Sequence, residues 1–177
     1  MTLDSECGFK DKSTGCMVGV AELQELPLFH QQVIPDSYLD AMGHVNVRWY
    51  MVLFDEASWR FFATHGIDEA YIRERRLGGM ALKHHIQYLA ELNAGESVAV
   101  HTRFLGRSKK RIHFMHFLIN ETTGKLSATL ESLGTHADME RRRSAEVPPD
   151  IAARMDATLY QHLQLHWTAP LCGAIDV

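Results

Sequence analysis

The segment from Val47 to about Thr64 constrains the fold more than any other part of this sequence, because it has the length of a helix and is apolar on nearly every side. A helix of this kind is buried on several sides rather than lying on a surface. His65-Gly66 supplies the signal that ends it. Its charged residues make the segment too polar to cross a bilayer. The apolar members are Trp49, Tyr50, Met51, Val52, Leu53, Phe54, Ala57, Trp59, Phe61, Phe62 and Ala63, and the charged ones are Arg48, Asp55, Glu56 and Arg60.

After this helix the pattern changes to a period of two. A short helical piece around 68–75 and a Gly78-Gly79 break come first, and segments of alternating apolar residues follow. Short links such as Ala94-Gly95-Glu96 predict antiparallel pairing between successive strands. A first strand is predicted at 29–38 and a last amphipathic helix at about 150–164. The alternating residues are Met80, Leu82, Ile86 and Tyr88, then Val98, Val100, Thr102 and Phe104, then Met115, Phe117 and Ile119, then Leu126, Ala128 and Leu130.

One very apolar helix followed by an antiparallel meander predicts a single curved sheet wrapped around that helix, which is the α+β arrangement called the hotdog fold. With 177 residues, of which 46% are hydrophobic, the chain can bury one sizeable core, and we expect one domain at 27–166. We interpret 1–26 as a loose N-terminal extension and 167–177 as a C-terminal tail.

Charge and cysteine usage narrow the class of protein. A formal charge of -4 argues against nonspecific nucleic-acid binding. Three cysteines, Cys7, Cys16 and Cys172, fit neither a disulfide framework nor a paired-cysteine metal site, which favours a reducing, cytoplasmic location. The apolar stretch at 17–21 is too short for a signal-peptide core, and no segment has the length to span a membrane.

A polar cluster, Asp40-Ala-Met-Gly43-His44-Val-Asn46, stands directly before the apolar helix. The amino end of a helix presents unpaired N–H groups and a partial positive charge, so it can hold a developing oxyanion. Asp40 would lie beside it as a base or nucleophile. The alternative is structural: Asp40 or Asn46 caps the helix and Gly43 makes a turn.

From about Gln31 to Val147 the chain resembles the hotdog-fold acyl-CoA thioesterases of the 4-hydroxybenzoyl-CoA thioesterase type. The resemblance rests on Asp40-x-x-Gly43-His44-Val45-Asn46 followed by Tyr50, on Phe54-Asp55-Glu56-Ala57, on Gly66 and on the hairpin Leu105-Gly106-Arg107-Ser108. Leu89-Ala90-Glu91, Lys110-Arg111-Ile112-His113 and His136 further resemble the thioesterases found beside or fused to carnitine dehydrogenases, a branch that acts on betainyl-CoA.

The resemblance implies that Asp40 is the catalytic carboxylate, either as a nucleophile through a mixed anhydride or as a general base for water. It implies that backbone N–H groups of Asn46 or Val47, and of Gly79 or Met80, polarise the thioester carbonyl. Val47 stands where many members repeat the asparagine.

Three further side chains, from the loop and the helix, complete the catalytic candidates. His44, together with Asn46, would position the water or the carbonyl. Other hotdog thioesterases use a helix glutamate, which makes Glu56 a secondary candidate; its alternative role is that of a helix-surface or interface charge.

Coenzyme A phosphates need cationic side chains at an exposed loop, and the hairpin at 107–111 offers Arg107, Ser108, Lys109, Lys110 and Arg111. The alternative is a solvated turn. Arg141-Arg142-Arg143 is a second candidate.

We predict no metal and no cofactor. His84 and His85 are adjacent on a strand and point to opposite faces, as do His113 and His116. The rings of Trp49, Tyr50, Trp59 and Tyr88 are typical of a core; if the resemblance to the carnitine-linked branch holds, some of them could cradle a trimethylammonium acyl group.

The sequence therefore predicts a cytoplasmic acyl-CoA thioesterase, a homodimer or homotetramer with its site at a two-fold interface, and no nucleic-acid or membrane partner. Two alternatives stay open. One is a hotdog hydratase or dehydratase, although the spacing of Asp40 and His44 differs from the usual one there. The other is a noncatalytic acyl-CoA-binding module.

Overall fold

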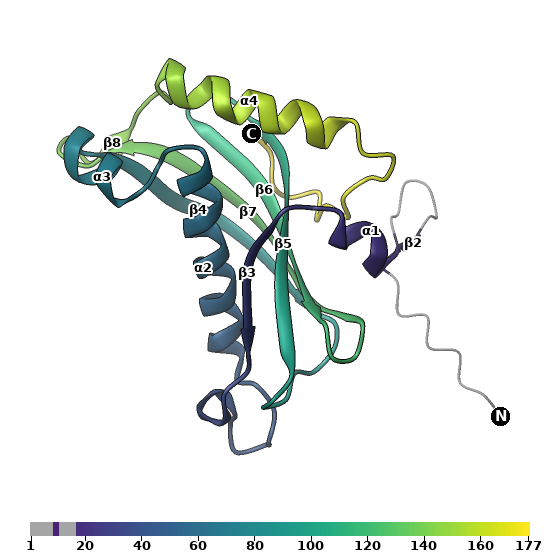
Figure 1. Ribbon diagram of the computed structural model, residues 1–177. Helices are drawn as coiled ribbons and strands as arrows, with labels where there is room; N and C mark the ends of the chain where they lie inside the picture. The colour runs from purple at the N-terminus through teal and green to yellow at the C-terminus, as the bar shows by residue number, and fades with distance from the viewer. Residues whose placement is uncertain (1–8, 11–16) are drawn as a thin grey trace.

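The computed structural model describes residues 9–10 and 17–177, and Figure 1 shows its elements. A curled antiparallel sheet holds one long helix against its inner face, so the α+β hotdog fold is confirmed. In chain order the elements are β1 (Phe9–Lys10), β2 (Met17–Val18), α1 (Val20–Gln24), β3 (Leu28–Val33), the 3-10 turn η1 (Asp36–Tyr38), α2 (Val47–Thr64), α3 (Glu69–Arg75), β4 (Leu77–Tyr88), β5 (Ser97–Arg107), β6 (Arg111–Asn120), β7 (Lys125–Asp138), β8 (Arg143–Ser144) and α4 (Pro149–Leu163).

The helix α2 spans the predicted residues, and its N-terminus is capped by Asn46, whose side chain accepts from the Arg48 N–H. Its buried residues recur at helical spacing and face the sheet: Tyr50, Leu53, Phe54, Ala57 and Phe61. Apolar residues on the other side, Val52 and Trp59, are exposed, and so is Val47 at the start of the helix. The expectation that the helix is buried on several sides is therefore met on one side only within a single chain.

The sheet order is β3-β5-β6-β7-β4, which corrects the predicted meander of four strands. Strands β5, β6 and β7 do pair in succession, but β4 pairs with β7 at the far edge. The segment 89–96 connects β4 to β5 past β7 and β6, and two backbone hydrogen bonds anchor it: the Leu89 N–H donates to the Ser127 carbonyl, and the Val45 N–H donates to the Leu92 carbonyl. Gly78-Gly79 also lies inside β4 rather than breaking the chain before it.

Both ends of the described chain cover the outer face of the sheet. Val18, Leu23 and Leu26 are buried there against Phe117, and so is Trp167 from the C-terminal segment. Within the segments interpreted as a loose extension at 1–26 and a C-terminal tail at 167–177, the residues Val18, Leu23, Leu26 and Trp167 are therefore packed against the sheet; residues 1–8 and 11–16 lie outside the described part. The apolar side chains of Val18, Leu23, Leu26 and Trp167 are too widely spaced for a sequence period to reveal that they are buried.

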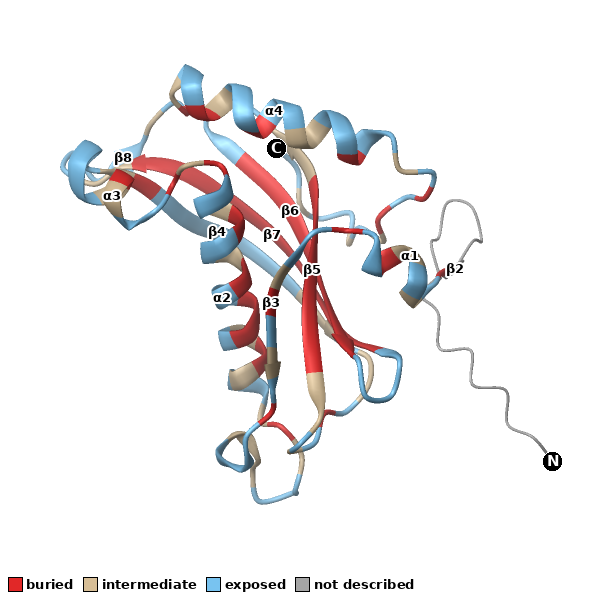
Figure 2. Ribbon diagram, viewed as in Figure 1, coloured by how far each residue is buried: buried red, intermediate tan, exposed pale blue. Residues whose placement is uncertain are grey.

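The edge strand β4 is the exposed part of the sheet. Figure 2 shows β5, β6 and β7 mostly buried, whereas β4 carries a long exposed stretch. Residues from Gly79 to His85 are exposed, and they include the apolar Met80 and Leu82. A long apolar edge of this kind is a surface on which another strand can pair.

Replacing Phe61 with alanine should lower the free energy of unfolding by about 3–5 kcal/mol, because the fully buried ring packs against Phe104 and Phe114 and its loss leaves a cavity. Urea unfolding followed by circular dichroism measures this. Tyr160, which is 69% exposed on α4, is the control, and its alanine variant should stay within about 0.5 kcal/mol of the parent. Equal losses in the two variants would contradict the core assignment.

Candidate functional site

The loop before α2 folds back on itself. Leu39 pairs with Val45 as an isolated β-bridge, and Gly43 takes a positive φ of 87° at the tip. The Asp40 carboxylate accepts the Met42 N–H at 2.8 Å, so it caps this turn, while Asn46 caps the helix. Gly43 and Asn46 thus have the structural roles of the alternative interpretation. Asp40 uses its Oδ1 atom in the turn and does not cap the helix.

Asp40 and His44 face each other across this loop. Their Oδ1 and Nδ1 atoms are 3.5 Å apart, which is longer than a hydrogen bond, and their side chains are 18% and 30% exposed. Within the described part of the chain the Val47 N–H, the first of α2, has no acceptor. The Asp40 carboxylate thus lies beside His44, and His44 lines the same cavity as Val47, whose N–H is free; these are the types of group that acyl-transfer chemistry uses.

A cavity of 260 Å³ opens beside this loop, and we call it the helix-entrance cavity. The Tyr50 and Tyr88 rings meet edge to face in it at 5.1 Å. Burial raises the pKa of Tyr50 to about 12, so its hydroxyl stays protonated at neutral pH. The lining residues are His44, Val45, Val47, Tyr50, Tyr88, Leu89, Ala90 and Glu91.

A second cavity, of 380 Å³, lies between α2 and the first half of β4, and we call it the α2–β4 cavity. Gly79 and Met80, the two predicted carbonyl-binding positions on β4, line it. So do helix residues that sequence reasoning did not assign to a site, notably Asp55 and Ser58. The signal that could have found them is their spacing from Met51 and Phe62, which puts all four on one side of α2.

The structure separates the predicted catalytic residues into two groups at opposite ends of β4. Tyr88 lies at the end that touches His44 and Val47, whereas Gly79 begins the other end. These two β4 residues are nine positions apart, which is about 30 Å along a strand. A single chain therefore does not bring the Asp40 loop to the Gly79–Met80 backbone.

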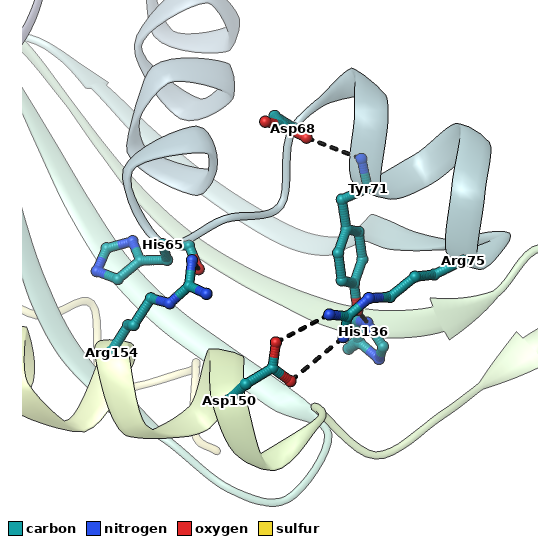
Figure 3. A network of polar contacts seen from close by, with 7 residues as sticks. All are labelled: His65, Asp68, Tyr71, Arg75, His136, Asp150 and Arg154. Atoms are coloured by element: carbon teal, nitrogen blue, oxygen red, sulfur yellow. Dashed lines mark hydrogen bonds and ion pairs between the residues drawn. The ribbon is translucent and has the colours of Figure 1, made fainter.

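Near the Gly79 end of β4, a polar network joins α3, β7 and α4, as Figure 3 shows. Asp68 caps α3 by accepting the Tyr71 N–H at 2.8 Å, and Arg75 pairs with both Asp150 oxygens at 3.2 and 3.0 Å. The buried Tyr71 hydroxyl lies 2.9 Å from His136 Nε2. Burial lowers the pKa of His136, so its ring is neutral and accepts a hydrogen bond from the Tyr71 hydroxyl. This bond holds α3, which directly precedes β4, against β7.

The predicted cationic hairpin is partly committed to internal contacts. Arg107 is half-buried and donates from Nε to Asp156 on α4 at 2.6 Å, and Ser108 Oγ accepts the Arg111 N–H. Arg107 is therefore engaged in an ion pair with Asp156. Lys109 is 83% exposed, and its Nζ lies 3.9 Å from Glu146 Oε1.

Next to the hairpin lies a pocket of 390 Å³ that we call the cationic pocket. It combines the hairpin with the arginine run, the two candidate phosphate sites of the sequence. Its lining residues are Lys110, Asp138, Arg141, Arg143, Ser144, Ala145 and Glu146.

Glu56 lies apart from the described lining of these cavities. It faces Arg60 on the exposed side of α2 at 3.9 Å, and Arg60 in turn donates to the Phe29 carbonyl on β3. The helical period turns Glu56 about a quarter of a turn away from Asp55, which supports its alternative role as a surface charge.

The chain belongs to the thioesterase-like superfamily, whose sequence pattern matches residues 34–155. It is similar to the betainyl-CoA thioesterase of Pseudomonas aeruginosa, with 29% identity over 145 residues that cover 80% of this chain and 89% of that protein. It also matches the L-carnitine dehydrogenase/betainyl-CoA thioesterase of Ruegeria pomeroyi at 31% identity over 76% of this chain, but it spans only 27% of that longer protein.

Solved structures share the fold. A Staphylococcus aureus protein determined in complex with CoA superposes with a TM-score of 0.77 and 24% identity, covering 86% of this chain and 96% of the other. A DHNA-CoA thioesterase of the same organism superposes with a TM-score of 0.70 and 15% identity, covering 80% of this chain and 97% of the other. In the described residues no helix is long and apolar enough to cross a membrane.

The pair of Arg107 and Asp156 should behave as a stabilising contact. Alanine at either position should cost about 1 kcal/mol of unfolding free energy at pH 7, and a double-mutant cycle should show that the losses overlap. The Arg107 guanidinium lowers the pKa of Asp156, so the coupling is present above the usual carboxyl pKa and is lost as pH falls through the lowered one. Additive losses at pH 7 would contradict the pair.

Proposed function

We propose that this protein hydrolyses betainyl-CoA to glycine betaine and coenzyme A. The acyl-CoA thioesterase class follows from the superfamily match at 34–155 together with the thioesterase names of the curated relatives. The particular acyl group is our inference from the two betainyl-CoA relatives. The observation that carries the chemistry is the approach of Asp40 to His44 in the loop directly before α2, whose first N–H, that of Val47, is free.

In the proposed reaction Asp40 acts on the thioester carbonyl carbon in one of two ways. It attacks that carbon directly, the C–S bond breaks, coenzyme A leaves as the thiolate, and water then hydrolyses the mixed anhydride. Alternatively it takes a proton from the water that attacks. His44 orients the water or the carbonyl, Asn46 holds the helix end in place, and the Val47 N–H donates to the developing oxyanion.

We propose a homodimer in which two β4 edges pair antiparallel. Antiparallel pairing sets the Tyr88 end of one strand beside the Gly79 end of the other, and this would bring the Asp40 loop of one protomer to the Gly79–Met80 backbone of its partner. Exposed apolar residues on α2 and along the free edge strand support this arrangement, because pairing would cover apolar surface: Val47, Val52, Trp59, Met80, Leu82 and Tyr88.

The coenzyme A phosphates are proposed to bind at the cationic pocket and the adjoining hairpin. Lys109, Lys110 and Arg111 come from the hairpin, and Arg141 and Arg143 come from the turn after β7. Strand register places Arg111 opposite Thr135 and Thr135 opposite Met80, so these cations lie across one strand from the proposed carbonyl site. We also propose a cytoplasmic location, which the free Cys172 supports.

Replacing Asp40 with asparagine should lower kcat for betainyl-CoA by roughly 10²–10⁴-fold, because the amide keeps the shape and the Met42 contact but loses the basicity. Release of free thiol measures the rate, and circular dichroism should be unchanged. Turnover close to that of the parent would reject the catalytic role of Asp40.

The same assay separates the other two functional classes. Tight coenzyme A binding with no thiol release from any acyl-CoA would indicate a binding module. Consumption of an enoyl-CoA without thiol release would indicate a hydratase. Either result would overturn the proposal.

Mixing two inactive variants tests the shared site. Gly79→Leu should block the α2–β4 cavity while still folding, because the space beside the Gly79 Cα is empty within 4 Å. Co-expressed with Asp40→Asn, it should restore about a quarter of the parent activity, since random pairing makes half of the dimers hybrids with one intact site each. A mixture as inactive as the separate variants would mean that the site is contained in one chain.

A further inference from the structure

The α2–β4 cavity is an apolar chamber with a single charged wall group. Among its described lining residues there is no lysine or arginine, and Asp55 is the one acidic residue. No described cation forms an ion pair with Asp55, whereas the neighbouring Glu56 is paired with Arg60. Asp55 is solvent-exposed at the wall of the cavity, and an unpaired carboxylate beside apolar walls attracts a positively charged occupant.

The histidines near Asp55 do not neutralise it. His84 lines the same cavity, and burial lowers its pKa. His116 lies behind the wall, where burial lowers its pKa to about 3. Burial outweighs the raising effect that the Asp55 charge has on the pKa of His84, so neither ring is a cationic partner of Asp55 at neutral pH.

The second polar group on the helix wall presents an acceptor rather than a donor. Ser58 Oγ donates to the Phe54 carbonyl at 2.9 Å, and its other contact is His116 Nε2 at 2.9 Å. Because the serine proton is used in the first bond, the neutral imidazole must donate in the second, and Thr102 donates to its Nδ1 at 2.7 Å. The free Ser58 lone pair adds negative potential on the side of Asp55.

The remaining wall suits a bulky, methylated cation. Trp59 lies one helical turn after Asp55, so both side chains are on the same side of α2. Phe62 contributes a second ring. Met51, Met80 and Met139 supply polarisable thioether groups around them. Aromatic faces and a carboxylate together recognise quaternary ammonium groups, which have no N–H to donate.

We propose that Asp55 and Trp59 form a specificity subsite in the α2–β4 cavity that holds the trimethylammonium group of the acyl chain. This inference rests on the proposed function. It assigns a recognition role to residues that have no part in the proposed bond breaking, and the subsite lies beside Gly79 and Met80, where the thioester carbonyl would be bound.

The test compares betainyl-CoA with 3,3-dimethylbutyryl-CoA, in which a carbon atom replaces the quaternary nitrogen. The two thioesters have nearly the same shape and differ by one charge. The parent enzyme should prefer betainyl-CoA in kcat/KM. Asp55→Asn should reduce that preference by roughly 10–100-fold, through loss of turnover of the cationic substrate with the neutral one unchanged or improved.

Matched variants separate charge from shape. Trp59→Leu should also lose preference for the cation, whereas Trp59→Phe should keep most of it, because a ring face remains. Glu74→Gln removes an exposed charge on α3 that is 70% exposed, and it should leave the ratio of the two kcat/KM values unchanged. Circular dichroism and the oligomeric state of each variant should match those of the parent.

The outcomes distinguish this inference from the proposed function. If the parent cleaves both thioesters and Asp55→Asn slows them equally, or slows neither, the subsite is overturned while the thioesterase remains. If the parent cleaves neither thioester, the proposed function itself fails. A preference of the parent for the neutral thioester would overturn the assignment of the cavity to a cation.

Discussion

The packing of one side of α2 against the inner face of the curled sheet is the contact on which the rest of the molecule depends. Phe54, Ala57 and Phe61 are fully buried there, and the sheet must curve to cover them. The same contact sets the depth at which His116 lies, stacked on the Phe54 ring at a centroid distance of 5.9 Å. The helix therefore fixes both the core and the polar wall behind the α2–β4 cavity.

Because only one side of α2 is buried, apolar surface on its other side stays in contact with water in the single chain. Val52 and Trp59 stay exposed beside the exposed edge of β4. Exposed edges invite pairing, and pairing across a two-fold axis would cover the apolar side of the helix at the same time. It would also join the two separated parts of the site. One unfilled surface thus accounts for both the exposed residues and the division of the proposed site between the ends of β4.

The sequence was sufficient for the elements that rest on a strong local pattern. The bounds of α2, the antiparallel strands and the polar loop at 40–46 follow from period, caps and turn residues, and they are as expected. The strand order was not accessible, because the turn at 94–96 looks like a hairpin link and the backbone contacts that carry 89–96 across the sheet leave no periodic trace. The partner of Arg107 was missed for a similar reason, since Asp156 is 49 residues away.

The charges of the cationic pocket and the α2–β4 cavity favour one orientation of the proposed substrate. Coenzyme A brings negative phosphates, whereas a betainyl group brings a positive charge at the other end of the molecule. The cationic pocket and the α2–β4 cavity adjoin each other, because Thr135 lines the second and donates to the Lys110 carbonyl of the first. A chain with a net charge of -4 repels the phosphates overall, so their binding would depend on the local cations of the cationic pocket. Together with Asp55 in the α2–β4 cavity, these cations would hold the thioester between them in one orientation.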